Sequence, residues 1–184
     1  MIETDLSSFS NKEYEPGSLF KRILWYLVSL LIFRPPIPWP SGIKVLILRT
    51  FGAEVGSGVV IKPSIVIKYP WYLSIGSNVW IGEQVWIDNL VKVTLGNNSC
   101  ISQGAMLLTG NHNYKKSTFD LMAQPIYISE GVWIGAKSVV CPSVRCESHA
   151  VLTVGSVATV DLEPYSVYSG IPATKTKTRE IFEG

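Results

Sequence analysis

The feature that most constrains this 184-residue chain is a six-residue hydrophobic repeat, which begins at Val55 and continues with three interruptions to about Asp161. The first position of each hexad is apolar, and the fifth position is mostly small or apolar. So long a run of apolar residues in one column argues strongly against chance. The first-position residues are Val55, Ile61, Ile67, Ile75, Ile81, Ile87, Leu95, Ile101, Leu107, Ile128, Ile134, Val140, Cys146, Leu152 and Ala158.

This repeat fits neither an α-helix nor a flat strand. Six helical residues turn the chain through about 600°, so successive repeats would point in different directions. A flat strand points every second side chain inward, whereas the third position of the hexads is polar or sterically awkward, as at Pro63, Glu83 and Gln103. Glycine and asparagine, which tolerate the backbone angles of tight corners, recur between the two apolar columns. The chain is therefore predicted to bend once in every hexad.

Three such hexads make one triangular coil, and stacked coils bury the first and fifth columns in a prism-shaped core. Residues 55–72, 75–92, 95–112 and 128–145 fit four coils, and a fifth, less regular coil starts at residue 146. Hexapeptide repeats of this kind are typical of parallel β-helices. We predict an all-β chain with three parts, which are an N-terminal extension with short apolar helices over 1–50, a β-helix over 51–163 with an inserted loop at about 113–127, and an extended basic C-terminal tail over 164–184.

Charge and cysteine content exclude several classes of function. The net charge is only +2, and no basic stripe with interleaved aromatic residues is present, which argues against binding of nucleic acid. The three cysteines form no pattern typical of metal ligands, so no metal is expected. An odd number of cysteines without a secretory signal fits a reducing compartment, and we expect a cytoplasmic protein.

The N-terminal region contains an unusually apolar segment, residues 23–33. As a helix it would span about 16 Å, roughly half the hydrocarbon thickness of a bilayer, so it is not expected to cross a membrane. It is not a signal peptide either, because no small-residue cleavage site follows it. Two roles stay open for residues 19–48, which are packing on the end of the prism or on a neighbouring subunit, and peripheral contact with a membrane, on its inner face.

The one long break in the repeat lies between His112 and Ile128. A long excursion from so regular a solenoid indicates function, because regular coils would otherwise continue. His112 is one of two histidines, and an imidazole titrates close enough to neutral pH to accept a proton there. The other, His149, lies in the turn part of a hexad and is expected to be a surface residue. The sequence therefore predicts that His112 is the functional histidine.

The hexads and the histidine-bearing loop after the third coil resemble the left-handed β-helix acyltransferases. The resemblance is closest to the sugar O-acetyltransferases of the maltose, galactoside and nodulation-factor type, and within them to the colanic-acid-type exopolysaccharide acetyltransferases. It extends from about Phe9 to Arg179, and it implies a left-handed parallel β-helix. The segments that carry it are 61–63, 68–71, 79–90, 101–104, 109–112 and 131–136.

The resemblance implies an acetyl-CoA-dependent O-acetyltransferase that forms no acyl-enzyme. His112 would then act as the general base on an acceptor hydroxyl. The backbone N–H of Ala136 would donate to the oxyanion of the tetrahedral intermediate. The acceptor implied is a saccharide hydroxyl in an exopolysaccharide or its lipid-linked precursor. The implied substrate-binding residues are Asp88, Asn89, Tyr114 and Trp133.

The resemblance also implies a homotrimer, with acetyl-CoA bound in a groove between subunits. The sequence departs from the family where Val160 and Thr174 stand in place of basic residues, and Lys175 is expected to substitute for the second of these. Lys and Arg in the tail suit the phosphates of CoA. The implied cofactor-binding residues are Gly135, Gly155, Ser156, Thr159, Lys175, Lys177 and Arg179.

Two other functions remain as alternatives on the same fold. One is a non-catalytic β-helix scaffold, against which the His112 loop argues. The other is a metalloenzyme like the γ-class carbonic anhydrases, which needs about three imidazoles for each zinc ion. With only His112 and His149 in the chain, the metalloenzyme is strongly disfavoured.

Overall fold

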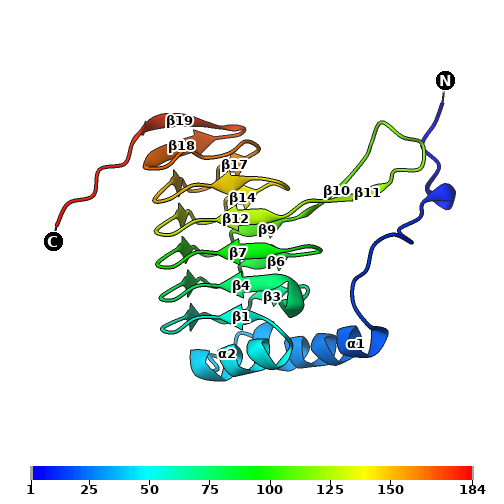
Figure 1. Ribbon diagram of the computed structural model, residues 1–184, viewed down its shortest axis with the longest axis horizontal. Coiled ribbons are helices and arrows are strands. Elements are labelled where there is room, and N and C mark those ends of the chain that lie inside the picture. The colour runs from blue at the N-terminus through cyan, green and yellow to red at the C-terminus, as the bar shows by residue number, and fades with distance from the viewer. Residues whose placement is uncertain (1, 184) are drawn as a thin grey trace.

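The computed structural model describes residues 2–183, which form a parallel β-solenoid of stacked triangular coils (Figure 1). Each coil contributes one short strand to each of three sheets, which we name A, B and C in the order in which the chain visits them. This arrangement confirms the predicted parallel β-helix. Sheet A contains β1 (Glu54–Val55), β4 (Leu73–Ile75), β7 (Val93–Leu95), β12 (Ile126–Ile128) and β15 (Arg145–Cys146).

The other two sheets complete the prism. Sheet B contains β2 (Val60–Ile61), β5 (Trp80–Ile81), β8 (Cys100–Ile101), β13 (Trp133–Ile134), β16 (Val151–Leu152), β18 (Ser166–Gly170) and β19 (Ala173–Thr178). Sheet C contains β3 (Val66–Ile67), β6 (Trp86–Asp88), β9 (Met106–Leu108), β14 (Val139–Val140) and β17 (Val157–Ala158). The chain therefore turns at three kinds of corner, from A to B, from B to C, and from C back to A.

The apolar columns of the sequence form the core. Ile61 pairs with Ile81, Ile81 with Ile101, and Ile101 with Ile134, so that one column of hexads becomes one vertical stack. Nearly all first-position side chains are buried, and so are most of the fifth-position side chains between Val59 and Val144. Burial of apolar surface in this continuous stack is the main source of the stability of the solenoid.

Successive coils approach closely at their corners, and the corner at Gly96 leaves no room for a side chain. A Cβ atom added at Gly96 would lie 2.6 Å from the backbone nitrogen of Glu130 in the coil above. No side chain fits at this distance without displacing the backbone. The glycine is therefore required by stacking rather than by the local turn alone.

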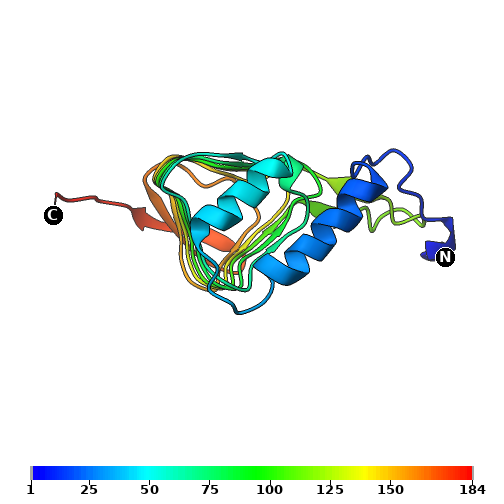
Figure 2. The ribbon, with the colours of Figure 1, turned by 90° about the horizontal axis from the view of Figure 1, so that it is seen from below.

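Two helices from the N-terminal region cover one open end of the prism (Figures 1 and 2). They are α1 (Leu19–Val28), which continues into the π-helical η2 (Ser29–Phe33), and α2 (Ser41–Thr50). Their inward side chains Trp25, Phe33 and Leu48 are buried and join the solenoid core. Two single-turn 3-10 helices, η1 (Leu6–Ser8) and η3 (Pro70–Tyr72), lie elsewhere.

These helices also supply hydrogen-bond donors to the edge strand of all three sheets. Lys44 is buried, and its Nζ donates to the carbonyls of Ile61 (3.1 Å) and Lys62 at the edge of sheet B. Trp25 Nε1 donates to the Ile67 carbonyl of sheet C at 2.9 Å. Arg49 donates to carbonyls at the end of β1 in sheet A. Because unpaired edges invite further strand pairing, packing on the end of the prism is one role of this segment.

The outward faces of the same helices are apolar and exposed. None of the helices within residues 2–183 has both the length and the apolarity needed to cross a bilayer. The helices nevertheless present large apolar side chains to solvent on the face that points away from the coils. These exposed residues include Leu19, Phe20, Ile23, Leu24, Leu27, Leu30, Leu31, Ile43 and Leu46.

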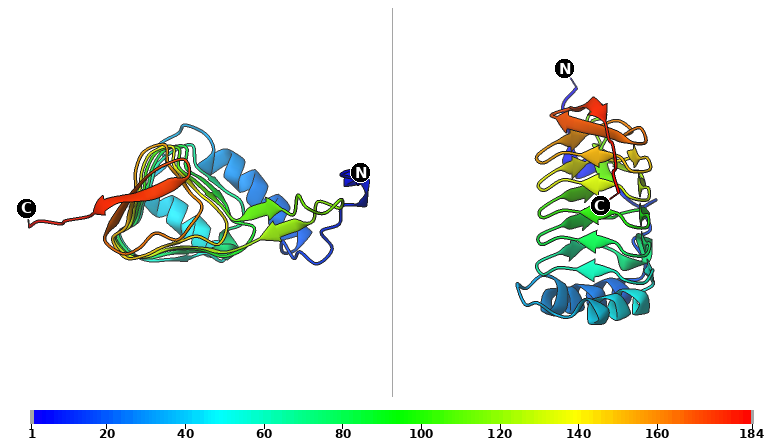
Figure 3. Two further views of the ribbon diagram at one scale, coloured as in Figure 1. Left: turned by 90° about the horizontal axis from the view of Figure 1, so that it is seen from above. Right: turned by 90° about the vertical axis from the view of Figure 1, so that its left-hand side faces the viewer.

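The insertion leaves the solenoid at the corner between sheets C and A. Its strands β10 (Gly110–His112) and β11 (Leu121–Ala123) form an antiparallel hairpin that projects from the prism. The N-terminal segment runs beside this hairpin, and the Asp5 N–H donates to the Ser117 carbonyl at 2.9 Å. At the far end of the stack, β18 and β19 form a second antiparallel hairpin that extends sheet B (Figure 3). The segment expected as a tail therefore begins as the last rung of the solenoid.

We predict that Gly96→Ala lowers the free energy of unfolding by about 1–3 kcal/mol, the usual cost of overpacking a well-packed site. The matched control is Gly42→Ala in α2, where an added Cβ meets nothing within 4 Å. There the helix propensity of alanine favours the folded state by up to about 1 kcal/mol. Chemical denaturation at equal protein concentrations measures both changes, and equal effects of the two substitutions would contradict the stacking argument.

Candidate active site

A cavity of about 380 Å³ lies beside His112, where three parts of the chain meet. The hairpin contributes His112 itself, the corner between sheets C and A contributes Lys68 and Asp88, and the N-terminal segment contributes Phe9 and Tyr14. Of the residues predicted from sequence to bind or react, this cavity therefore brings together His112 and Asp88.

The His112 ring is held in one orientation by the hairpin. Its Nδ1 lies 2.9 Å from the Phe119 carbonyl oxygen. A carbonyl only accepts hydrogen bonds, so Nδ1 carries the hydrogen and Nε2 of the neutral ring keeps its lone pair. The ring stacks on the Phe119 ring with centroids 4.4 Å apart, and the Phe9 ring lies 5.8 Å away. The histidine is thus positioned to accept a proton at Nε2.

Phe119 adopts a backbone conformation that is unusual for a residue with a side chain. Its φ angle is +51°, in the left-handed region that glycine and asparagine favour. In this conformation both its ring and its carbonyl face His112. A sterically costly conformation thus occurs where it orients the histidine, as is common near functional sites.

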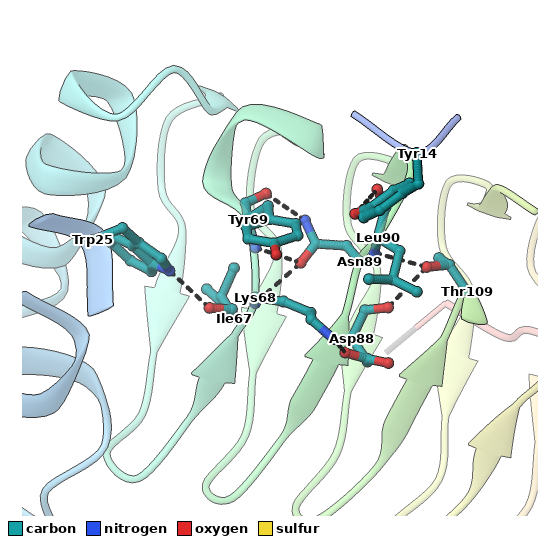
Figure 4. Close-up of polar contacts among 9 residues, drawn as sticks. All are labelled: Tyr14, Trp25, Ile67, Lys68, Tyr69, Asp88, Asn89, Leu90 and Thr109. Carbon is teal, nitrogen blue, oxygen red and sulfur yellow. Dashed lines mark hydrogen bonds and ion pairs between the residues drawn. The ribbon is translucent and has the colours of Figure 1, made fainter. Parts of the chain in front are cut away.

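Asp88 lines the cavity and forms an ion pair with Lys68 (Figure 4). Its carboxylate lies 2.9 Å from Lys68 Nζ, and its side chain is largely buried. The two residues come from β6 and from the corner that follows β3, and coil stacking places them side by side. They give this wall one carboxylate and one ammonium group, both able to bind the hydroxyls of a substrate.

Asn89 is not available to a substrate, contrary to the expectation from sequence. The side chain is completely buried. Its amide oxygen accepts the N–H groups of Lys68 and Tyr69, each at 3.1 Å, and its NH₂ group donates to the Tyr69 carbonyl at 2.6 Å (Figure 4). The role of Asn89 is to join its corner to the corner of the coil beneath.

Tyr114 also lies outside the cavity. It follows the end of β10, and 75% of its surface is exposed. Its N–H donates to the His112 carbonyl, which fixes the backbone of the turn but not the ring. Within one chain, Tyr114 therefore does not line the cavity beside His112.

The N-terminal segment brings to the cavity two residues that were not expected from sequence. The Tyr14 hydroxyl donates to the Leu90 carbonyl at 2.8 Å (Figure 4). Burial, reinforced by neighbouring hydroxyl and carboxylate groups, raises the pKa of Tyr14 well above its ordinary value, so the phenol stays protonated. No motif marks Tyr14 or Phe9, because only the folded path of this segment places them near His112.

A second hollow, of about 780 Å³, lies on sheet B and is lined by Trp133, Lys177 and Arg179. Trp133 is 48% exposed, and its Nε1 donates to Ser102 Oγ at 2.9 Å, which fixes the ring plane. Arg179 Nη1 donates to the carbonyls of Gly131 and His149, so this part of the guanidinium is already hydrogen-bonded within the chain. Apolar side chains beside Lys177 and Arg179, with Glu180 as the one carboxylate of the lining, suit a long, partly apolar ligand with terminal phosphates.

The predicted oxyanion donor lies at the corner between sheets B and C. The Ala136 carbonyl accepts the Gly155 N–H at 2.9 Å, which ties this corner to the next coil. In the part of the chain that the structure describes, the Ala136 N–H has no backbone acceptor. A Cβ at Gly135 would lie 2.6 Å from the Val154 nitrogen, so this glycine allows the two corners to stack.

Three other residues predicted to bind the cofactor do not line the hollow on sheet B. The Ser156 side chain is buried and accepts the Gly170 N–H at 3.0 Å, so its hydroxyl serves the fold rather than a ligand. Lys175 Nζ lies 2.6 Å from a Glu163 carboxylate oxygen. Thr159 is exposed after β17, where sheet C leads back to sheet A, and it does not line the hollow on sheet B.

One chain does not bring the two sets of residues together. The His112 hairpin projects from one corner of the prism, whereas the C-terminal strand and the residues after it leave from the opposite side (Figures 1 and 2). His112 and Asp88 lie in one cavity, and Trp133, Lys177 and Arg179 in another. A single reaction centre that used both sets would need a neighbouring copy of the chain.

No protein family model matches this chain. Individual proteins do match it. The chain is 35% identical over 180 residues to the "Putative colanic acid biosynthesis acetyltransferase WcaF" of Escherichia coli (strain K12), and the match covers 95% of this chain and 97% of that protein. It is 29% identical over 129 residues to the galactoside O-acetyltransferase of the same strain, which covers 68% of this chain and 64% of that protein.

A solved structure shares the fold along nearly the whole chain. It is a hexapeptide-repeat-containing acetyltransferase from Vibrio cholerae O1 biovar eltor, complexed with acetyl coenzyme A. The TM-score is 0.82, with 19% sequence identity, and the superposition covers 95% of this chain and 97% of that one.

Proposed function

Because this chain belongs to the hexapeptide-repeat acetyltransferases, and is therefore an acyltransferase, we propose that it transfers the acetyl group of acetyl-CoA to a saccharide hydroxyl during synthesis of an exopolysaccharide or its lipid-linked precursor. The observation that carries the proposal is the His112 ring, which the Phe119 carbonyl holds with Nε2 free beside a polar cavity. The name of the Escherichia coli relative and the acetyl coenzyme A bound to the Vibrio protein support the choice of acceptor and donor.

In the proposed reaction His112 acts as a general base. Nε2 takes the proton of the acceptor hydroxyl while the hydroxyl oxygen attacks the thioester carbonyl carbon. A carbon–oxygen bond forms, the carbon–sulfur bond breaks, and CoA leaves as the thiol after it receives the proton from His112. The hydrogen bond from Nδ1 to Phe119 stabilises the ring throughout and keeps it in the required tautomer.

The remaining elements of the site come from the neighbouring subunit in the proposed homotrimer. The hollow lined by Trp133 and Lys177 would hold the CoA arm and its phosphates. The Ala136 N–H would donate to the oxyanion of the tetrahedral intermediate, a role that needs no side chain. A cyclic trimer can place this face of one subunit against the His112 corner of the next, because its interfaces join unlike surfaces.

His112→Asn should lower kcat by about 10²–10⁴-fold, the usual contribution of a general base, without loss of folding. The matched control is His149→Asn. That histidine stacks on Tyr165 and has a φ angle of +60°, which asparagine also tolerates. Release of CoA thiol in the presence of an acceptor measures both rates. Equal rates for the two variants would contradict the role of His112.

Ala136→Pro tests the oxyanion donor, because proline has no backbone N–H. The chain already has proline at this point of a corner, at Pro63 before Ser64 (φ +59°) and at Pro142 before Ser143 (φ +70°), and Ala136 precedes Lys137 (φ +56°). Loss of one oxyanion donor costs about 10²–10³-fold in kcat.

Coexpression of His112→Asn with Ala136→Pro chains should restore activity to about a quarter of the wild-type value, since random assembly gives that share of interfaces with both intact residues. The double variant alone should stay inactive. Glu83→Pro, at the same corner two coils below, controls for the effect of proline on folding. Failure of the two single variants to complement each other would contradict a site shared between subunits.

The exposed face of α1, η2 and α2 supports a further part of the proposal, which is peripheral contact with a membrane. Large apolar side chains, such as Phe20 (77% exposed) and Leu31 (68% exposed), lie on this face. Arg34 directly follows the same helical segment and is exposed, so it can approach anionic headgroups. Such contact would bring the enzyme close to a lipid-linked acceptor.

Vesicles that contain anionic lipid should carry the protein upward in a flotation gradient, and the Leu31→Glu variant should remain in the dense fraction. A charge on an interfacial apolar face opposes insertion. Val160→Glu, at another apolar and exposed position far from the helices, serves as the control. Flotation of all three proteins to the same extent, or of none, would contradict the proposed contact.

A further inference from the structure

A groove of about 600 Å³ runs between the N-terminal helices and sheet C. Its helical side includes Arg22, Tyr26 and Arg34, and its sheet side includes Trp86. The groove shares four lining residues with the His112 cavity, namely Arg22, Lys68, Tyr69 and Asp88. A ligand that lies in the groove can therefore extend to the reacting histidine without leaving the protein surface.

The groove has an excess of positive charge. It is lined by Arg22, Arg34 and Lys68, and by a single carboxylate, Asp88, which is paired with Lys68 at 2.9 Å. Neither arginine forms an ion pair within residues 2–183. Arg22 Nε is buried there without a hydrogen-bond partner, which is costly unless a ligand supplies an acceptor. Two guanidinium groups are thus available to an anion.

Aromatic rings line the same groove. Trp86 is 41% exposed and Tyr26 is 51% exposed, and the Arg34 guanidinium lies over the Tyr26 ring at 5.2 Å. Exposed aromatic faces can pack against the apolar faces of sugar rings, while nearby polar groups determine orientation. Cations and aromatic rings in one groove therefore match a saccharide that carries a negative charge.

We propose that this groove binds an oxyanion of the acceptor, a phosphoryl or carboxylate group on the saccharide, while the hydroxyl to be acetylated faces His112. This inference rests on the proposed acetyltransferase function and names its substrate class. Arg22 and Arg34 bind the oxyanion through paired N–H donors, a geometry that suits both phosphate and carboxylate. Trp86 and Tyr26 contact the sugar rings, and Lys68 stays with Asp88 at the entrance to the His112 cavity.

The test compares acceptors that differ only in charge, which are glucose, glucose 1-phosphate and glucuronate. Calorimetry of these three with the inactive His112→Asn variant measures binding, and thiol release by the active enzyme measures KM. We expect both anionic sugars, or one of them, to bind at least 10-fold more tightly than glucose. Preference for glucose 1-phosphate identifies a phosphoryl group as the natural anion, and preference for glucuronate identifies a uronic acid.

Arg34→Gln should weaken binding of the anionic sugar by about 10-fold and leave the KM of acetyl-CoA unchanged. Arg22→Gln should act similarly, and circular dichroism checks its folding. The matched control is Arg145→Gln, which removes an arginine that also lies over a tyrosine ring, Tyr127 at 4.5 Å, but on sheet A. Because Arg34 is exposed, its variant is expected to fold even if the Arg22 variant does not.

The outcomes separate this inference from the proposed function. Acetylation of glucose and of the charged sugars with equal KM, unaffected by Arg34→Gln, would overturn the anionic groove and leave the acetyltransferase in place. Binding of a charged sugar that Arg34→Gln abolishes, without any acetyl transfer by the wild-type protein, would support the groove and contradict the proposed function.

Discussion

The structure depends on the in-register stacking of its coils. Backbone N–H groups of the strands donate to carbonyls of a neighbouring coil, as Gly82 does to Ile101 at 2.8 Å. Since each coil repeats the path of its neighbour, the place of a hexad within its coil determines its sheet, and the position of a residue within the hexad determines whether it lies in a strand or at a corner. Even the insertion respects this rule, because Ile126 pairs with Val93 once the hairpin returns to the prism. The hairpin can vary without disturbing the core, which makes it a suitable carrier for His112.

The solenoid has two ends, and the proposed function assigns a role to each. At one end the helices donate to the edges of all three sheets through Lys44, Trp25 and Arg49. The same helices form one wall of the basic groove and expose an apolar face. At the other end, β18 and β19 continue sheet B and place Lys177 beside Trp133. The elements that end the stack therefore also supply the residues proposed to bind the two substrates.

Much of the fold could be predicted from sequence, because one repeating column carries most of the information. The site was less predictable. The position of a residue in its hexad indicates that it lies at a corner, but not which neighbours its side chain contacts there. Asp88 and Asn89 are neighbours at the same corner, yet Asp88 lines the cavity and Asn89 bonds to the coil beneath. Ser156 was expected to contact the cofactor, yet its hydroxyl is buried and accepts the Gly170 N–H.

The contributions of Phe9, Tyr14 and Arg22 could not be predicted, because they depend on how a non-repeating segment folds against the prism. The orientation of the His112 ring could not be predicted either, because it depends on the left-handed conformation of Phe119. By contrast, the position of His112 at the single long break in the repeat made it the candidate base from sequence. Local patterns thus pointed to the proposed reacting group, and tertiary contacts determine its surroundings.

The most direct test is a crystal structure of the H112N variant with acetyl-CoA. The account predicts a cyclic trimer in which the thioester carbonyl oxygen lies about 3 Å from the Ala136 N–H of one subunit. The carbonyl carbon should face position 112 of the neighbouring subunit. A thioester bound far from both positions, or a protein in which no neighbouring subunit reaches the His112 cavity, would contradict the account.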